Sequence, residues 1–420
     1  MITPARALYD RHHRMVHAYL SMVGGSAVRL VLSLIYFICI ANVLPISEFG
    51  LFASASATGV MVSRALAFGF MSPLYRVATV KHRLIGTYTT GFLVGALFSL
   101  PLIVALCALI YFLLFAEDMA GPVFLRFMLA EIICWRGLEV VSNVLNGTGQ
   151  FARSALMVVI GQALRTLSAV AFYALSFNTL SDWSSFYLAS NIISLAIAIV
   201  VFYPRVRLRW RPELYIRRWV DSVSVAGAEI LFYVQSEFDK LVVLAAGGPE
   251  VTGIYAIVMR LADLTALPVR SFNTLLVQQI MRSPAILKRG RTKPMIEAII
   301  AGVSLLAIAG MAGYLTLFPR GLGNNVAEIA PFVAMVLLVP GFRNLVEYHS
   351  ELLYATGQTV RRVVNLACLG AMKVGLLWLL LQETTAPTGW VPMLNLVFLA
   401  VYATSMALTY PSVQRWAAQR

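Results

Sequence analysis

Arginines that lie inside apolar segments are the residues of this chain best suited to chemistry. Arg29, Arg64, Arg136 and Arg165 belong to four different segments, and each lies roughly 13–18 Å from the same membrane face at 1.5 Å per residue. An arginine that faces lipid at such a depth costs at least ~2.5–3.5 kcal/mol. The guanidinium groups would also repel one another unless water or a shared anion lies between them. The four arginines therefore predict a polar interior that binds an anion.

The charge balance inside the apolar segments differs between the two halves of the chain. The first half has only Glu131 and Glu139 against five bases, whereas the second half has seven acids against five bases. Arg136 has Glu139 one helical turn away, but Arg29 and Arg64 have no acid on their own segments. We expect this positive surplus in the first half to serve anion binding.

The acids of the second half are expected mainly to form internal ion pairs. Same-face helical spacing pairs Arg260 with Asp263 and Arg343 with Glu347. Asp239 and Arg260 also lie at similar depths on either side of a short turn. As an alternative, three acids are candidate binding residues for a coupling proton or sodium ion: Glu237, Asp239 and Asp263.

Two stretches of sequence occur twice at corresponding positions. Leu145–Arg153 matches Leu353–Arg361 through a shared Thr-Gly-Gln-x-x-Arg pattern, and Glu48–Ala53 matches Val251–Ala256 around a glycine. The offsets, 208 and 203 residues, are nearly equal. Repeats of this kind indicate a duplicated unit of membrane helices that run in parallel through the two halves.

Composition places the chain in the membrane. Of its 420 residues, 60% are hydrophobic and 12% charged, with a mean hydropathy of +0.79, whereas about a quarter of the residues in a soluble domain are charged. Apolar runs of about twenty residues, each long enough to cross a bilayer, recur throughout. They predict an all-α polytopic membrane protein with about twelve transmembrane helices in two pseudo-symmetric six-helix lobes, residues 1–203 and 222–420, joined by a basic linker, 204–221. The predicted spans are 20–43, 51–72, 88–114, 122–146, 153–177, 183–203, 222–246, 252–280, 295–318, 328–352, 361–381 and 391–411.

Basic residues in the loops fall almost entirely on one side of the predicted membrane. Arg320 is the sole exception, so the positive-inside rule predicts that both termini and the long loops are cytoplasmic. This distribution explains the net charge of +14 without a nucleic-acid partner. In the linker, arginines alternate with Leu, Trp and Ile, a pattern suited to an anionic membrane surface, although a role in topology alone is the simpler interpretation.

The stretch Asp239–Leu244, followed after an outer turn by Gly253–Ala256 and Arg260, resembles the mid-chain hairpin of the polysaccharide transporter family. This family contains the O-antigen and exopolysaccharide repeat-unit flippases of the multidrug/oligosaccharidyl-lipid/polysaccharide (MOP) exporter superfamily. Glu48–Ala53 resembles the first hairpin of the family, and the Thr-Gly-Gln-x-x-Arg turns resemble its cytoplasmic turns. The resemblance covers the whole chain in length, span number and repeat, while the additional helix pair of the lipid II flippases is absent.

This resemblance implies two lobes around a central cavity that opens alternately to the two sides of a bacterial cytoplasmic (inner) membrane. The implied substrate is a polyprenyl-diphosphate-linked oligosaccharide, moved to the outer leaflet and passed on to polysaccharide polymerase machinery. Relatives carry cationic residues in the cavity, and arginine binds phosphate oxygens in pairs. The predicted diphosphate-binding residues are Arg29, Arg64, Arg136, Arg165 and Arg260.

Two other functions are considered. A multidrug exporter of the same superfamily typically binds cations, which would favour acids at mid-depth in the first half. A membrane glycan polymerase or ligase usually carries a large extracytoplasmic loop, but every outer loop here is short. The sequence has no nucleotide-binding loop, no HExxH and no paired cysteines, and His82 and His349 stand alone. We therefore expect no cofactor, no metal and no enzymatic activity.

Overall fold

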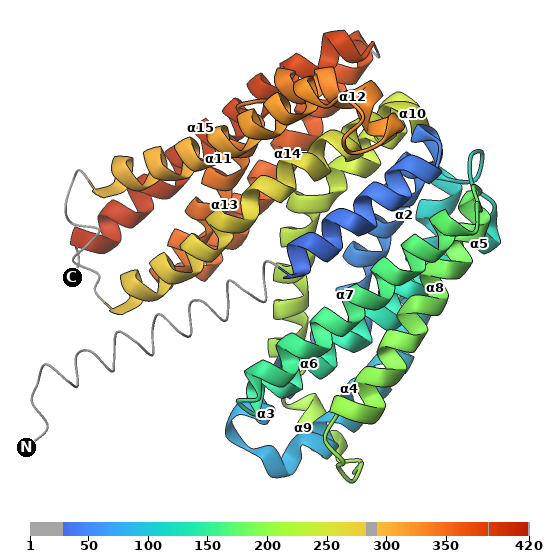
Figure 1. Ribbon diagram of the computed structural model, residues 1–420. Helices are drawn as coiled ribbons and strands as arrows, with labels where there is room; N and C mark the ends of the chain where they lie inside the picture. Colours follow the sequence, from blue (N-terminus) through green and yellow to red (C-terminus); the bar gives the residue numbers. More distant parts are fainter. Residues whose placement is uncertain (1–27, 283–291, 385, 419–420) are drawn as a thin grey trace, which may run out of the picture.

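The computed structural model describes residues 28–282, 292–384 and 386–418 (Figure 1). These residues form helices and short connections, with no strand among them. Part of the first predicted span, residues 20–27, and part of one basic loop, residues 283–291, lie outside the described residues, as do Arg6, Arg11 and Arg14. The prediction of an all-helical polytopic protein is confirmed.

The first half begins with a helix over Val28–Val43. It continues with α2 (Ile46–Ser63), η1 (Leu66–Gly69), α3 (Met71–Val80), η2 (His82–Leu84), α4 (Ile85–Leu114), α5 (Gly121–Met128), η3 (Leu129–Trp135), α6 (Arg136–Gly147), α7 (Phe151–Ala174), α8 (Leu180–Ile197) and η4 (Ala198–Phe202). The second half contains α9 (Pro212–Ile216), α10 (Trp219–Arg282), α11 (Thr292–Leu317), α12 (Asn324–Met335), α13 (Val339–Ala355), α14 (Thr359–Glu383) and α15 (Pro387–Ala418).

Membrane-crossing helices account for most of these elements. Seven described helices are long and apolar enough to span a bilayer, or eight when the bent pair α12 and α13 is one span. The other crossings are shorter or carry more charge: Val28–Val43, α2 with α3, and α5 to α6 through the π-helical η3. Because α10 folds back on itself at Gly248 (φ 76°), its halves cross separately, which gives about twelve crossings in all.

Two of the predicted spans are broken helices. The span predicted over 51–72 ends its first helix at Ser63, and Ala67 and Phe68 adopt left-handed backbone conformations (φ 54° and 47°) before α3 begins. The span predicted over 328–352 divides into α12 and α13, which meet at 71°. Hydropathy does not detect such breaks because the residues on both sides remain apolar.

The repeated Thr-Gly-Gln-x-x-Arg sequence forms the same turn twice. Gly149 and Gly357 adopt left-handed conformations (φ 76° and 74°), which glycine accepts without steric cost. In both copies the Gln backbone N–H donates to the Leu carbonyl five residues earlier, at 2.8 and 2.9 Å, and the Arg donates to the Gln side chain at 2.7 Å. The duplication read from the sequence is therefore present in three dimensions.

The glycines of the other repeated stretch contact each other. A Cβ on Gly50 would lie 2.3 Å from the Pro249 carbonyl oxygen, and a Cβ on Gly253 would lie 1.9 Å from the Ile46 carbonyl oxygen. Nearby, the Asn42 side chain donates to the Leu322 carbonyl at 2.6 Å, and Asn325 donates to Leu44 at 2.9 Å. We call this contact between the two halves the apex.

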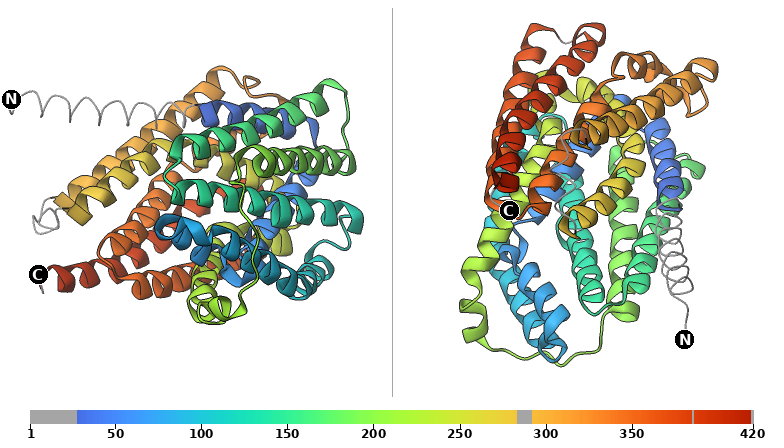
Figure 2. Two further views of the ribbon diagram at one scale, coloured as in Figure 1. Left: turned by 90° about the horizontal axis from the view of Figure 1, so that it is seen from below. Right: turned by 90° about the vertical axis from the view of Figure 1, so that its left-hand side faces the viewer.

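The two helical bundles meet at the apex and separate toward the other end (Figure 1). That other end carries the basic loops, and we call it the basic end. The first half of α10 lies between the bundles, packed against both α2 and α14. The linker runs under the basic end of the first bundle (Figure 2, right), where the Tyr215 hydroxyl donates to the Thr87 carbonyl at 2.9 Å.

Candidate interior binding site

A network of four charged side chains joins the first bundle to α10. Both terminal nitrogens of Arg64 donate to the Glu139 carboxylate, at 2.8 and 3.0 Å. Arg136 donates to Glu139 at 2.8 Å and to Glu229 of α10 at 2.9 Å. Arg64 also lies over the Tyr233 ring, 4.1 Å from its centroid. The network holds two arginines and two carboxylates, so its formal charge is balanced.

This network changes the interpretation of Arg64. The sequence places no acid on the same helix, but Glu139 reaches Arg64 from α6. The predicted pair of Arg136 with Glu139 is confirmed. Both arginine side chains are buried, with 4% and 0% exposure. Arg64 and Arg136 are thus ion-paired in this conformation and offer little positive charge to an anion.

Arg165 has a different environment. Its guanidinium donates to the Asn191 side-chain oxygen at 2.9 and 2.6 Å. It also lies 4.0 Å from the ring centroid of Trp135 and 5.1 Å from that of Tyr187. The nearest acid, Glu131, is engaged by the hydroxyls of Ser56 and Tyr187. Arg165 is therefore held in place by an amide and two aromatic faces while its charge is not neutralised by a direct carboxylate bond.

Arg260 joins this region from the second half of the chain. It donates to the Ser33 hydroxyl of the first helix at 2.6 Å. Ser33 is one helical turn from Arg29, which is exposed, so the two lie on one face of that helix. Tyr36, a half-buried residue of the same helix, is within electrostatic range of Arg165, Glu131 and Arg260.

The five predicted anion-binding arginines therefore divide into two groups. Arg64 and Arg136 belong to the balanced network. Arg29, Arg165 and Arg260 have no carboxylate hydrogen-bond partner among the described residues, and they come from helices of both halves of the chain. We call these three the interior arginines. Aromatic rings of Tyr36, Trp135 and Tyr187 lie among them.

The acids considered for ion coupling are all bonded to bases or phenols. Asp239 is buried and accepts from Lys373 at 3.1 Å and from the Tyr255 hydroxyl at 2.8 Å. Glu237 accepts from Lys240 at 2.6 Å.

The expected same-helix pairs of the second half are wrong. Asp263 pairs with Arg343 at 2.9 Å instead of Arg260, and Glu347 pairs with Arg270 at 3.2 Å. Same-helix spacing places two side chains on one face, but each side chain here points to a neighbouring helix and finds its partner there.

A further polar cluster near the basic end was missed in the sequence. His349, fully buried, bonds Glu297 at 2.8 Å through Nε2 and the Ser405 hydroxyl at 2.9 Å through Nδ1. The hydroxyls of Tyr402 and Tyr410 also donate to the Glu297 carboxylate. His349 appeared isolated because Glu297 is 52 positions away in the chain. Within the described ranges, no group of three or more His, Cys, Asp and Glu residues could hold a metal ion.

Comparisons of sequence find no relative: no protein-family model and no curated protein matches the chain. Comparisons of structure do. The chain is similar to an inward-facing multidrug resistance MATE family transporter of the MOP superfamily, with a TM-score of 0.65 and 15% identity over 94% of this chain and 98% of that one.

Two further solved structures cover similar shares. An outward-facing MATE family transporter matches with a TM-score of 0.59 and 14% identity, over 96% and 95% of the two chains. A MOP superfamily transporter from Pyrococcus furiosus, described as having a binding pocket of reversed polarity, matches at 0.55 and 14%, over 96% and 95%. At this level of identity the matches show the fold, and they leave the predicted polysaccharide branch untested. The chain has the fold of the MATE transporters of the MOP superfamily.

Proposed function

We propose that the protein is an alternating-access flippase that moves a polyprenyl-diphosphate-linked oligosaccharide from the inner to the outer leaflet of a bacterial cytoplasmic membrane. The observation that carries this proposal is the set of interior arginines. Arg165 is held inside the first bundle by Asn191, Trp135 and Tyr187, and Arg260 reaches the first helix at Ser33, one turn from the exposed Arg29. Glu131, the acid within electrostatic range of Arg165, is already engaged by hydroxyl groups. A diphosphate supplies the missing negative charge, and the planar guanidinium binds its oxygens in pairs.

The surroundings of these arginines suit the remainder of such a substrate. Tyr36 and Trp135 are half-buried rings beside Arg165 and Arg260. Aromatic rings offer an apolar face together with a polar edge or hydroxyl, which fits the faces and hydroxyl groups of sugars. The prenyl chain can stay in the bilayer between the bundles, which separate toward the basic end (Figure 1).

The arrangement of the bundles supports alternating access. With the basic end in the cytoplasm, as the loop charges predict, the apex faces outward and the bundles diverge toward the side on which the substrate is made (Figure 1). Release on the other side requires the apex to separate. Its polar contacts are three asparagine hydrogen bonds, beside the two close glycine approaches.

Replacement of an interior arginine is expected to impair flipping more than folding. In proteoliposomes loaded with a fluorescent polyprenyl-diphosphate oligosaccharide, Arg165→Gln and Arg260→Gln should each lower the flipping rate by about tenfold or more, because a hydrogen bond to a charged group contributes roughly 1.5–3 kcal/mol. The rate is measured as the fraction of substrate protected from a reagent added outside the vesicles.

Arg126→Gln is the matched control for these variants. Arg126 bonds Ser181 and Ser184 in the first turns of α8 and makes no contact with Asn191, the α8 residue that holds Arg165. It should flip substrate at the normal rate. Normal flipping by both Arg165→Gln and Arg260→Gln would remove the proposed diphosphate site.

A multidrug exporter is the second candidate, because the similar solved structures include multidrug resistance MATE transporters. This alternative predicts extrusion of cationic dyes such as ethidium by the reconstituted protein. Glu131 would then be the natural cation partner, and Glu131→Gln would abolish dye transport. If the protein transported dye but did not flip the lipid-linked substrate, it would be a multidrug exporter and not a flippase.

We further propose that ion coupling resides in the second lobe, on α10. Glu237, Asp239 and Asp263 are the acids we put forward for a coupling proton or sodium ion, which would have to displace Lys240, Lys373 or Arg343. Asp239→Asn also leaves the buried Lys373 without its carboxylate, so the variant is compared per folded molecule. Its flipping rate should then be independent of an imposed proton or sodium gradient. Downstream, polysaccharide polymerase machinery is the proposed partner.

A further inference from the structure

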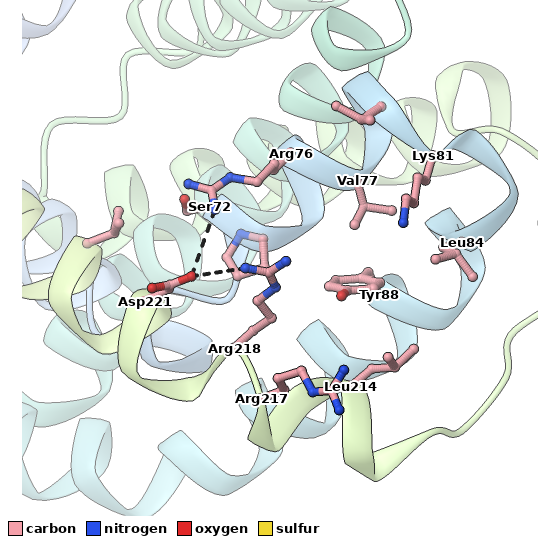
Figure 3. Close-up of a pocket in the computed structure, with 13 residues that line it drawn as sticks. Ser72, Arg76, Val77, Lys81, Leu84, Tyr88, Leu214, Arg217, Arg218 and Asp221 are labelled. Atoms are coloured by element: carbon pink, nitrogen blue, oxygen red, sulfur yellow. Dashed lines mark hydrogen bonds and ion pairs between the residues drawn. The ribbon is translucent and has the colours of Figure 1, made fainter.

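A basic pocket lies at the basic end, away from the interior arginines. It has a volume of about 310 Å³ and is formed by α3, the start of α4, α9 and the first turns of α10 (Figure 3). Its cationic lining comprises Arg76 and Lys81 from the first bundle and Arg217 and Arg218 from the linker. Asp221 is the single acid that lines it.

The four cations are incompletely neutralised. Asp221 accepts from Arg218 at 3.2 Å and lies 3.8 Å from Arg76, as Figure 3 shows. The side chains of Lys81 and Arg217 have no ion pair or hydrogen bond to any residue in the described parts of the chain. The pocket therefore carries a formal charge of about +3, because Asp221 balances only one of its four bases.

Packed aromatic residues form the base of the pocket. Tyr88 is buried beneath it and stacks on Phe70, with ring centroids 5.7 Å apart. Phe70 in turn packs against Tyr215 of the linker at 5.6 Å. A side chain at Gly86 would collide with the Arg207 carbonyl oxygen, at 2.2 Å, so the linker is seated directly on α4. The cations are thus presented by packed helices rather than by a free loop.

Apolar side chains line the pocket beside its charges: Val77, Val80, Leu84, Leu214 and Val225. Val80 is 70% exposed. Trp219, next to Arg218 in the chain, is 47% exposed, and tryptophan is typical of the membrane–water interface. The pocket therefore combines cationic and apolar groups, as an amphiphile with an anionic head requires.

We propose that this pocket binds the phosphate head of an anionic membrane phospholipid, such as phosphatidylglycerol or cardiolipin. Basic pockets between membrane helices on the cytoplasmic side are a recognised way to bind such heads. The volume is at the small end for a ligand pocket, which suits a head group whose acyl chains remain in the bilayer beside the exposed Val80. A soluble phosphate would use the cations but not the apolar rim.

The pocket also connects two parts of the molecule. Arg76 belongs to α3, which follows the break after α2, and Lys81 directly follows α3. Arg217 and Arg218 precede the part of α10 that carries Glu229. A bound head group would bridge these segments and hold the start of α10 against the first bundle. We therefore expect the lipid to stabilise the protein in addition to binding it.

The test uses the purified full chain in neutral detergent, with thermal unfolding followed as lipid is added. Phosphatidylglycerol should raise the unfolding temperature, and phosphatidylcholine should not. The double variant Lys81→Gln/Arg217→Gln should bind phosphatidylglycerol about tenfold or more weakly, since two cations near the phosphate are lost. Both side chains are exposed and without partners in the described structure, so the variant should fold.

Two further variants make the test decisive. Arg205→Gln/Arg209→Gln removes the same amount of charge from the linker outside the pocket and should bind phosphatidylglycerol normally. Asp221→Asn frees Arg76 and Arg218 and should tighten binding. If both double variants bound phosphatidylglycerol equally weakly, general surface charge would explain the binding, and the proposed site would be wrong. An equal stabilisation by inorganic phosphate would overturn the assignment to a lipid.

Discussion

Replacing Glu139 with glutamine is expected to destabilise the protein more than any other single charge removal near the interior site. Glu139 is the carboxylate shared by Arg64 and Arg136, and the Arg64 side chain is only 4% exposed. Without Glu139, Arg64 would keep a carbonyl contact to Val60 and the Tyr233 ring but lose its counter-charge. Breaking a buried ion pair from one side typically costs roughly 3–5 kcal/mol.

The measurement is the thermal unfolding midpoint of the purified variant in detergent. Glu347→Gln is the matched control, because Glu347 pairs with Arg270 at 3.2 Å where 46% of the Arg270 side chain is exposed. Exposed pairs contribute about 0–1 kcal/mol, so this control should unfold close to the unmodified protein. Equal midpoints for Glu139→Gln and Glu347→Gln would contradict the assigned role of the network.

A double variant distinguishes the loss of the ion-pair attraction from the cost of leaving the Arg64 guanidinium buried without a counter-charge. In Glu139→Gln/Arg64→Met the buried guanidinium is gone, and Arg136 keeps Glu229 at 2.9 Å. The double variant should therefore recover much of the stability lost by Glu139→Gln alone. Such non-additivity is expected for residues in one network. Additive losses would indicate that packing around α6, rather than charge, sets the stability.

The architecture was largely predictable because it depends on local signals. Apolar length marks the crossings, and the Thr-Gly-Gln-x-x-Arg turn needs only a glycine with positive φ and side chains within three positions. The breaks were not predictable, because Ala67 and Phe68 adopt conformations unfavourable for their residue types. At the neighbouring Gly69, an added Cβ would lie 2.4 Å from the Ser222 carbonyl oxygen. Contact with α10 therefore determines the backbone conformation at this break.

The interior site was predictable in composition but not in pairing. The count of bases and acids on each segment predicts that cations gather in the first half. It does not reveal that Glu139 reaches Arg64 or that Lys373 reaches Asp239 across 134 positions. Helical spacing considers only partners three or four residues away, whereas partners in a helical bundle come equally from adjoining helices. The same reason explains why His349 appeared to have no partner.

Adding a single methyl group at the apex is expected to shift the conformational equilibrium of the whole protein. In Gly253→Ala the new Cβ would lie 1.9 Å from the Ile46 carbonyl oxygen and 2.7 Å from its carbonyl carbon. Both atoms belong to the backbone, so no side-chain rotation relieves the clash. The helices must separate by more than about 1 Å to reach ordinary contact distances. Conformations with a closed apex lose stability, and those with an open apex do not.

Distances between spin labels measure this shift. In a background without the native cysteines, labels at Asp118→Cys and Glu328→Cys report across the apex from exposed positions. Gly253→Ala should lengthen the mean distance and slow substrate flipping, because the closed-apex conformation is visited less often. Gly50→Ala should act in the same direction, since its Cβ would lie 2.3 Å from the Pro249 carbonyl oxygen.

The control for this experiment is a glycine with open space around it. A Cβ on Gly302 of α11 meets no atom within 4 Å, so Gly302→Ala should leave both the distance and the flipping rate unchanged. If Gly253→Ala and Gly50→Ala also left them unchanged, the glycines would be dispensable at the apex. If they prevented folding, Asn42→Ala, which removes the hydrogen bond to Leu322 without adding atoms, should still open the apex. A repeated glycine pair would thus act as the contact that one conformation makes and the other releases.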